Sequence, residues 1–252
     1  MKKVLITGAS DGIGLAVAHL FAKRGDQVTL VARNAGKLEA ATRSLQGTGH
    51  SFIVADLTTK DEVHKLKPLI EQQQFDVVIN NAGVGLYGKF HELTLSDQVK
   101  MMNLNMNALT AISHFYLSVA TSGSTLVNIA STLGTSSFAG LSVYSGTKAF
   151  VTIFSESLWR EYKKKGIYVM GFCPGVTATT FHSEAGSRTE AFPNFITQTP
   201  QEVAMELMRA IDRRRKPRVI SGLANRMMLF SQKFMSRRSV ATLMGRFSPV
   251  KI

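Results

Sequence analysis

Tyr144 and Lys148 stand four residues apart, with Gly146 between them, and Ser131 lies thirteen residues before Tyr144. If a helix accommodates Gly146, the phenol and the ammonium lie on one helix face. A nearby positive charge favours the ionised form of a phenol, so we expect Lys148 to lower the pKa of Tyr144. Such a phenol can act as general acid in carbonyl chemistry near neutral pH. On this spacing alone, the alternative is a solvated Tyr/Lys helix face.

A glycine-rich turn follows an apolar, β-branched run at the start of the chain, and a helical pattern of apolar residues follows the turn. Glycines allow the backbone to approach a pyrophosphate, which the helix N-terminus attracts. The spacing is G-x-x-x-G-x-G rather than G-x-G-x-x-G, and an ordinary glycine turn is the alternative. The predicted binding residues of this turn are Gly8, Ser10, Asp11, Gly12, Ile13 and Gly14.

Arg33 follows the second predicted strand, where an acid commonly holds a ribose 2′-hydroxyl. An arginine at this place suits a 2′-phosphate instead. We therefore expect NADP(H) to be favoured over NAD(H), the alternative being that Arg33 is only a surface residue.

The length of 252 residues fits one large α/β domain, and with 44% hydrophobic residues the chain can bury a core. No apolar run is long enough to span a membrane. The single cysteine, Cys173, excludes an internal disulfide and a cysteine zinc cluster, and it favours a cytoplasmic location. His91, His114 and His182 show no metal-ligand spacing, so no metal site is expected.

Strand and helix patterns alternate along the chain, which predicts a single doubly wound, Rossmann-like parallel sheet with helices on both faces. The predicted strands are Lys3–Thr7, Gln27–Ala32, Ser51–Ala55, Val77–Asn80, Thr125–Ile129, Tyr168–Cys173 and Arg218–Ile220. After a first helix that Gly25 ends, the predicted helices are Ala35–Leu45, Lys60–Gln73, Leu95–Ala120, Val143–Lys165 and one that begins at a Thr199-Pro200 cap and ends near Arg213.

With these elements in place, the chain resembles the short-chain dehydrogenase/reductase family over about residues 3–222. Five motifs occur in the family's order: Thr7–Gly14, Asp56-Leu57, Asn80-Asn81-Ala82-Gly83, Ser131 with Tyr144-x-x-x-Lys148, and Pro174-Gly175. The resemblance implies an NADP(H)-dependent enzyme that moves a hydride between nicotinamide and a carbonyl or alcohol carbon. The alternatives are a catalytically idle dinucleotide-binding regulator or redox sensor, and an epimerase or dehydratase that uses the same Tyr/Lys pair.

The resemblance also assigns catalytic roles. Tyr144 would be the acid or base, and Ser131 would bind the substrate oxygen. Lys148 would lower the pKa of Tyr144 and hold the nicotinamide ribose. Asn105 matches the asparagine of the proton relay, with Asn103 as the competing choice.

Further cofactor contacts follow from the same motifs. Asp11 departs from the basic residue frequent in NADP-preferring members, which leaves Arg33 to carry the cofactor preference. The remaining cofactor-binding residues implied by the resemblance, besides Tyr144 and Lys148, are Asp56, Leu57, Asn81, Ala82, Gly83, Pro174, Gly175, Thr177 and Thr179.

The segment Phe181–Gln198 is expected to cover the site as a lid, since it has three phenylalanines and few charges. With Tyr87 and Phe138, the residues Phe181, Phe192 and Phe195 would line a pocket for an apolar ketone, aldehyde or 3-oxoacyl compound. The alternative is that these aromatic residues only pack the lid.

The end of the chain is strongly basic. Residues 209–252 carry twelve of the thirty Lys/Arg and one acid, Asp212, and thus most of the net charge of +13. We divide the chain into a catalytic domain, 1–221, and a basic amphipathic extension, 222–252. The extension is expected first to pack against the body or a partner subunit, second to contact a membrane surface, and last to bind nucleic acid. The resemblance implies a homodimer or homotetramer formed through the helices near 95–120 and 145–165.

Overall fold

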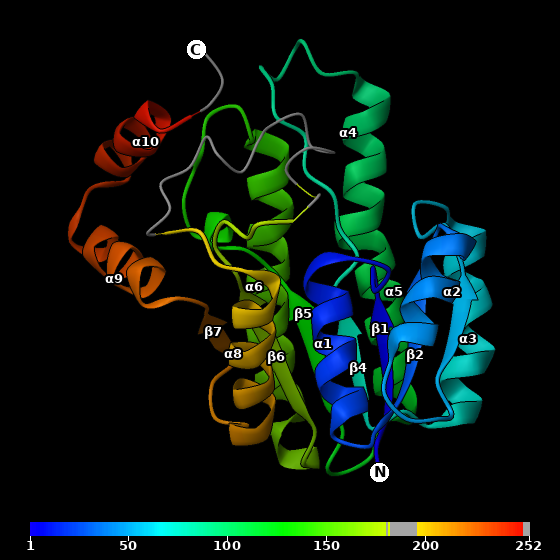
Figure 1. The fold of residues 1–252 in the computed structure, drawn as a ribbon. Helices are drawn as coiled ribbons and strands as arrows, with labels where there is room; N and C mark the ends of the chain where they lie inside the picture. Colours follow the sequence, from blue (N-terminus) through cyan, green and yellow to red (C-terminus); the bar gives the residue numbers. More distant parts are fainter. Residues whose placement is uncertain (180, 182–195, 249–252) are drawn as a thin grey trace.

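The computed structural model describes residues 1–179, 181 and 196–248. In this part of the chain, seven parallel strands form one sheet in the order β3-β2-β1-β4-β5-β6-β7 (Figure 1). The strands are β1 (Lys3–Thr7), β2 (Gln27–Ala32), β3 (Ser51–Val54), β4 (Val77–Asn80), β5 (Thr125–Ile129), β6 (Tyr168–Cys173) and β7 (Arg218–Ile220). The predicted doubly wound parallel sheet is confirmed, with β3 one residue shorter than expected.

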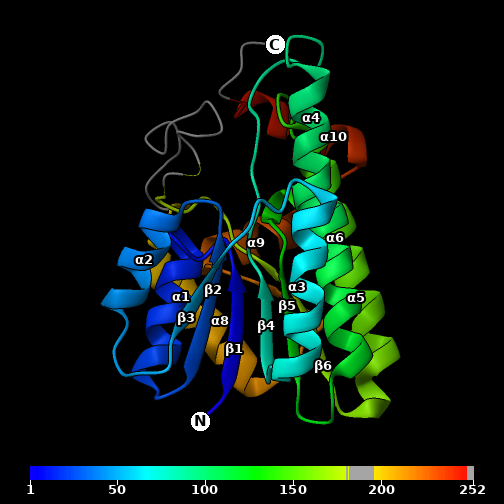
Figure 2. The ribbon, with the colours of Figure 1, turned by 90° about the vertical axis from the view of Figure 1, so that its right-hand side faces the viewer.

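Helices cover both faces of the sheet (Figure 2). One face carries α1 (Gly12–Lys23), α2 (Ala35–Ser44) and α8 (Pro200–Arg213), and the other carries α3 (Lys60–Gln73), α5 (Leu109–Val119) and α6 (Ser142–Tyr162). Strand residues alternate between the two cores: Val4 and Ile6 pack on the first face, and Leu5 packs on the second. Strands buried on both faces are apolar throughout, which is why β1 and β6 read as continuous apolar runs.

Side-chain caps set the starts of several helices. Asn34 accepts a hydrogen bond from the Lys37 backbone N–H at 2.9 Å and begins α2. Thr199 and Glu202 form the predicted capping box at the start of α8. Each such cap stabilises a helix by about 1 kcal/mol.

The expected helix over 95–120 is not a continuous α-helix. It consists of α4 (Leu95–Met102), a π-helical turn at Asn103–Ala108, and α5. The side chain of Asn105, inside this turn, bonds to the backbone of Val84 from a different part of the chain. The prediction missed the interruption because apolar periodicity does not register a tertiary contact of this kind.

Two helices follow β7: α9 (Leu223–Ser231) and α10 (Arg237–Arg246). They lie at the outer side of the sheet beyond α6 and β7 (Figure 1). In the described ranges, no helix has the length and apolar character needed to cross a membrane.

The strand order reverses between β1 and β4, and the carboxyl ends of all parallel strands meet at one edge. In doubly wound sheets, ligands bind in the crevice at such a reversal. Gly8, Arg33, Asn81, Ala130 and Pro174 directly follow β1, β2, β4, β5 and β6. With Ser131 directly after Ala130, the sheet therefore brings residues from four of the five sequence motifs to one place.

Candidate active site

A cavity of about 750 Å³ runs along the carboxyl edge of the sheet, from the glycine turn to the C-terminal helices. Of the predicted site residues, those in its lining are Gly8, Ser10, Asp11, Gly12, Ile13, Arg33, Asp56, Leu57, Asn81, Ala82, Gly83, Ser131, Tyr144, Lys148, Pro174, Gly175, Thr177 and Thr179. Gly14 and Asn105 are not part of the lining. Gly14 packs against the Gly8 carbonyl oxygen, and Asn105 bonds to the backbone of Val84, so each contacts a lining residue.

The glycine turn packs too tightly for side chains. A Cβ on Gly14 would stand 2.5 Å from the Gly8 carbonyl oxygen, and one on Gly8 would stand 2.7 Å from Ala82 Cα. The Asn81 side chain fixes the turn by donating to the carbonyl oxygens of Thr7 at 3.0 Å and Gly8 at 2.9 Å. Bare backbone thus faces the cavity at the N-terminus of α1, which fits the pyrophosphate of a dinucleotide.

Two cations lie where β2 ends. Arg33 and Lys37 are exposed, and both line the cavity together with Asn34. The sequence analysis missed Asn34 and Lys37, although a helix cap directly after Arg33 was a readable signal. This end of the cavity can hold a phosphate of an adenosine ribose.

Asp56 lies on the same side of the cavity, with Thr58 donating to it from the backbone at 3.0 Å and from the hydroxyl at 2.8 Å. Partial burial raises the pKa of the Asp56 carboxyl, but these bonds and the Arg33 charge outweigh it and hold the pKa below its ordinary value. Asp56 is therefore ionised at neutral pH.

Ser131, Tyr144 and Lys148 are buried side chains from two neighbouring segments. Ser131 follows β5 and caps a short 3₁₀ turn by accepting from the Leu133 N–H at 3.1 Å. Tyr144 and Lys148 lie one turn apart on α6, and the Lys148 Nζ lies 5.8 Å from the Tyr144 ring centre. The Lys148 ammonium donates to the Ile129 carbonyl oxygen at 2.8 Å, which ties α6 to the end of β5.

The 3₁₀ turn that Ser131 begins packs directly on α6. A Cβ on Gly134 would stand 2.5 Å from the Lys148 carbonyl oxygen. A glycine at this position therefore allows Ser131 and Tyr144 to come together.

The pKa of Tyr144 runs against the sequence expectation. Burial raises the pKa of the phenol above its ordinary value, a hydrogen bond with Ser131 lowers it, and Tyr87 raises it further. The net shift is therefore opposite in direction to the expected lowering, because desolvation of the buried phenol outweighs the hydrogen bond from Ser131. Tyr144 is therefore a protonated phenol at neutral pH, which suits a proton donor to a forming alkoxide.

Burial lowers the pKa of the Lys148 ammonium to about 8, and the Cys173 side chain opposes this shift. Lys148 is therefore mostly charged at neutral pH but loses its proton in mildly alkaline solution. Lys148 therefore places a positive charge beside the Tyr144 phenol mainly below about pH 8.

Asn105 and Asn103, the two candidates for the relay asparagine, occupy different surroundings. Asn105 is 1% exposed, and its side chain donates to Thr147 Oγ1 at 3.1 Å. A Cβ built on Gly83 would lie 3.2 Å from Asn105 Oδ1 and 3.3 Å from Lys148 Nζ, so both side chains approach the same point. Asn103 instead accepts from Asn107 on the helix surface. The structure therefore places Asn105, and not Asn103, beside Lys148.

A buried polar ladder, which the sequence analysis missed, connects the sheet to α6. Asn80 on β4 donates to the Asn128 side chain on β5 at 2.9 Å, and Asn128 donates to Ser155 Oγ on α6 at 3.0 Å. Asn80 also donates to Ser113 on α5. These bonds fix α6, and with it Tyr144, relative to the strands. In the sequence, Asn128 stands out as a polar residue among Leu126, Val127 and Ile129, which could have indicated a buried hydrogen bond.

The segment after β6 forms the far wall of the cofactor side. Thr177 is buried and forms a parallel β-bridge with Gln198. Thr179 Cγ2 would lie 3.1 Å from a Cβ on Gly12, so this segment approaches the glycine turn. A cofactor would therefore be held between the turn and residues 174–179.

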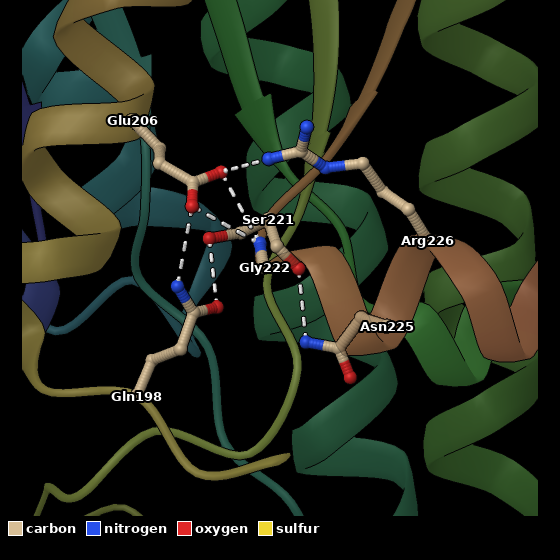
Figure 3. A network of polar contacts seen from close by, with 6 residues as sticks. All are labelled: Gln198, Glu206, Ser221, Gly222, Asn225 and Arg226. Atoms are coloured by element: carbon tan, nitrogen blue, oxygen red, sulfur yellow. Dashed lines mark hydrogen bonds and ion pairs between the residues drawn. The ribbon is translucent and has the colours of Figure 1, made fainter. Parts of the chain in front are cut away.

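A polar network attaches α9 to this wall (Figure 3). Glu206 on α8 accepts from the Gly222 N–H at 3.2 Å and from Arg226 at 2.9 Å. Asn225 donates to the Ser221 carbonyl oxygen at 2.9 Å and packs against Gly175. Helix α9 therefore packs on the body of the fold, which is one of the two contacts expected first for the extension.

The other end of the cavity is apolar. Phe138, Leu141 and Met244 are buried in one cluster with Tyr144, and Phe181 packs on the Tyr144 ring at a centre-to-centre distance of 5.8 Å. The predicted lining by Tyr87, Phe138 and Phe181 is confirmed, and the sequence analysis missed the contribution of α9 and α10. These added lining residues are Ala224, Asn225, Met228, Leu243, Met244 and Phe247.

Some expectations fall outside the described residues: Phe192, Phe195 and His182 lie there, and the lid over 181–198 stays a prediction. In the ranges that are described, no three His, Cys, Asp or Glu side chains come close enough to hold a metal ion.

The chain is similar in sequence and in fold to known dehydrogenases and reductases. A family model described as short chain dehydrogenase matches residues 2–190. Hydroxysteroid dehydrogenase-like protein 1 of Gallus gallus is 31% identical over 208 residues, which are 79% of this chain and 62% of the relative. Very-long-chain 3-oxoacyl-CoA reductase of Mus musculus is 32% identical over 184 residues, or 69% of this chain and 59% of the relative. The matched part thus spans about three-fifths of these curated relatives.

Among solved structures, a short-chain dehydrogenase from Sphingobium yanoikuyae in complex with NADPH superposes with a TM-score of 0.81 at 30% identity. The superposition covers 93% of this chain and 94% of that one.

Proposed function

Because this chain belongs to the short chain dehydrogenase family of oxidoreductases, whose members bind a nicotinamide cofactor, we propose that it is an NADP(H)-dependent enzyme acting on an apolar ketone, aldehyde or 3-oxoacyl compound. One observation carries the proposal. Ser131, Tyr144 and Lys148 are buried in the wall of a single cavity that has bare backbone at one end and apolar side chains at the other.

The residues divide the chemistry among them. The nicotinamide, when bound, supplies or accepts the hydride at carbon. In reduction, Tyr144 gives its proton to the carbonyl oxygen, and in oxidation it takes that proton back. The Ser131 hydroxyl binds the same oxygen, and the Lys148 ammonium stabilises the negative charge that forms there. Asn105 acts indirectly, by fixing the backbone of residue 84 and Thr147 beside the reacting groups.

Tyr144→Phe tests the catalytic assignment. Removal of the proton donor should lower kcat by roughly 10³-fold, within the range for general acids. Binding of NADPH, followed by its fluorescence, should stay within about twofold, because the substitution removes only the hydroxyl and leaves the Tyr144 ring in place. Turnover is measured as NADPH oxidation over a panel of ketones, aldehydes and 3-oxoacyl thioesters.

Tyr162→Phe makes the same chemical change at the other end of α6 and should leave turnover unchanged. Retained activity in Tyr144→Phe would contradict the assignment. Failure of the unaltered protein to oxidise NADPH with every substrate would favour the binding-only regulator instead.

The preference for NADP(H) is supported by Arg33 and Lys37, the two exposed cations at the end of β2. A 2′-phosphate between them would gain two charge-assisted contacts. In Arg33→Ala/Lys37→Ala, KM for NADPH should rise roughly 10- to 100-fold, while KM for NADH stays within about twofold. Steady-state kinetics with both cofactors measures this.

Arg213→Ala/Arg215→Ala removes two exposed cations at the end of α8 and serves as the matched control. If Arg33→Ala/Lys37→Ala weakened NADH and NADPH equally, the 2′-phosphate would not be the group recognised.

Association of subunits is supported by exposed apolar side chains on two helices. Ile153 on α6 is 65% exposed and Leu95 on α4 is 74% exposed. The family is often oligomeric, and we propose a homodimer or homotetramer through these helices. Ile153→Asp should shift the mass measured by analytical ultracentrifugation to that of a smaller species, and an unchanged mass would exclude this face.

A further inference from the structure

Helix α9 has two different faces. Its N-terminal end is held by the Glu206 network (Figure 3). Its inner face contributes Met228 to the cavity lining. Its outer face carries Leu223, Met227 and Phe230, and the same spacing continues to Phe234 in the turn that follows. These four side chains, hereafter the outer stripe, recur at helical spacing and are therefore on one side.

The outer stripe is apolar and uncovered in the described structure. Leu223, Met227, Phe230 and Phe234 are 68%, 64%, 60% and 79% exposed. Phe230 and Phe234 pack edge to face, with ring centres 5.4 Å apart. Contiguous exposed apolar groups of this kind mark interaction surfaces more often than single exposed residues do.

Positive charge lies at the Phe230–Phe234 end of the outer stripe, whereas Glu202 and Glu206 on α8 line a groove with Leu223 and Met227 at its other end. Lys233 Nζ lies 5.8 Å from the Phe230 ring centre, and exposed Arg237 and Arg238 begin the next helix. No Asp or Glu occurs in the sequence after Asp212. A second copy docked on the Phe230–Phe234 end would bring like charges together, whereas an anionic surface would be attracted there.

We propose that the outer stripe and its cations dock on an anionic lipid surface. Exposed Phe, Leu and Met beside Lys and Arg match the composition of helices that lie in a membrane interface. The apolar side chains enter the boundary between headgroups and acyl chains, and the cations contact the headgroups. Because α9 and α10 also line the cavity, docking places the apolar end of the cavity near the bilayer. An apolar substrate would then reach the cavity from the membrane, a consequence that rests on the proposed function.

Co-sedimentation of the full chain with phosphatidylcholine vesicles, with and without phosphatidylglycerol, tests the docking. We expect binding to the anionic vesicles only, with weaker binding at high salt. Arg237→Glu/Arg238→Glu should weaken binding by about tenfold or more. Lys164→Glu/Lys165→Glu, which reverses two exposed charges at the far end of α6, should bind like the unaltered protein.

Phe230→Ser/Phe234→Ser tests the apolar part and should also weaken vesicle binding by about tenfold or more. Its thermal unfolding and NADPH binding should match those of the unaltered chain, which shows that the fold is intact. These measurements need no carbonyl substrate, so an error in the proposed function would leave the docking result readable.

Three outcomes would overturn the proposal. The first is absence of binding to anionic vesicles by the unaltered chain. The second is a smaller assembly mass of Phe230→Ser/Phe234→Ser in analytical ultracentrifugation without a change in its vesicle binding, which would indicate that a second copy of the chain covers the stripe. The third is tighter binding to a single-stranded oligonucleotide, measured by fluorescence anisotropy, than to the vesicles.

Discussion

The two ends of the cavity recognise their ligands by different means. The cofactor end is built from backbone: Gly8 and Gly14 leave no room for a Cβ, and the Asn81 side chain fixes the turn. The substrate end is built from apolar side chains, such as Phe138 and Met244, that come from distant parts of the chain. The glycine turn at the cofactor end therefore selects by the path of the main chain, beside the Arg33 and Lys37 side chains, and the other end selects by side-chain volume.

This difference predicts different tolerance to mutation. Backbone cannot move aside without disturbing the sheet edge, so added atoms at the cofactor end should be severely harmful. Side chains at the substrate end can repack, so changes there should alter selectivity rather than remove activity. Each of the following substitutions tests this contrast.

Gly8→Ala should have the largest effect. Its φ of +62° disfavours any side chain, and the new Cβ would meet Ala82 Cα at 2.7 Å. Strain and overpacking together should weaken NADPH binding by more than roughly 100-fold, measured by fluorescence titration.

Gly146→Ala is the matched control, because a Cβ there meets nothing within 4 Å. Inside α6, one turn from its start, it should raise the free energy of unfolding by about 0.5–1 kcal/mol and leave NADPH binding unchanged. Equal effects of the two substitutions would refute the contrast between tight backbone and open helix.

Lys148, in the wall of the same cavity, should give an effect of comparable size that depends on pH. Burial lowers the pKa of its ammonium from 10.5 to about 8. Between these values the unfolded chain holds a proton that the folded chain has released, so stability rises with pH across the window. Below pH 8 both states hold the proton, and the full cost of burial remains.

The free energy of unfolding, relative to that of Lys148→Met, should therefore rise by roughly 3 kcal/mol between pH 8 and pH 10.5. Urea unfolding of both proteins across this range measures it. A difference that stays constant with pH would show that the Lys148 pKa is not lowered by burial.

Met244→Ala should have the smallest effect and should act at the substrate end alone. Removing this buried side chain widens the apolar end beside Tyr144. The ratio of kcat/KM for a bulky ketone over a small one should rise about tenfold, while KM for NADPH is unchanged. Met205→Ala, on the exposed side of α8, should change neither. An equal change in KM for NADPH would mean that the two ends do not act separately.

Local patterns in the sequence were enough for most of the cofactor end. The glycine turn, the strand Lys3–Thr7 before it and the helix after it are adjacent in the chain, and the strand bounds are confirmed. Lys37 was missed because one lysine on a helix surface has no distinctive spacing. The buried ladder from Asn80 to Asn128 was missed because a hydrogen bond across strands leaves no periodic trace.

By itself, the sequence determined the parallel α/β sheet and the spacing of Tyr144 and Lys148, because apolar periodicity and short motifs are local properties. Only the tertiary structure decided the depth at which Tyr144 is buried, and hence the direction of its pKa shift. It also decided that one face of the C-terminal helices closes the cavity while the outer stripe stays exposed. Burial depends on which segments meet in space, and residues far apart in the chain carry no mark of that meeting.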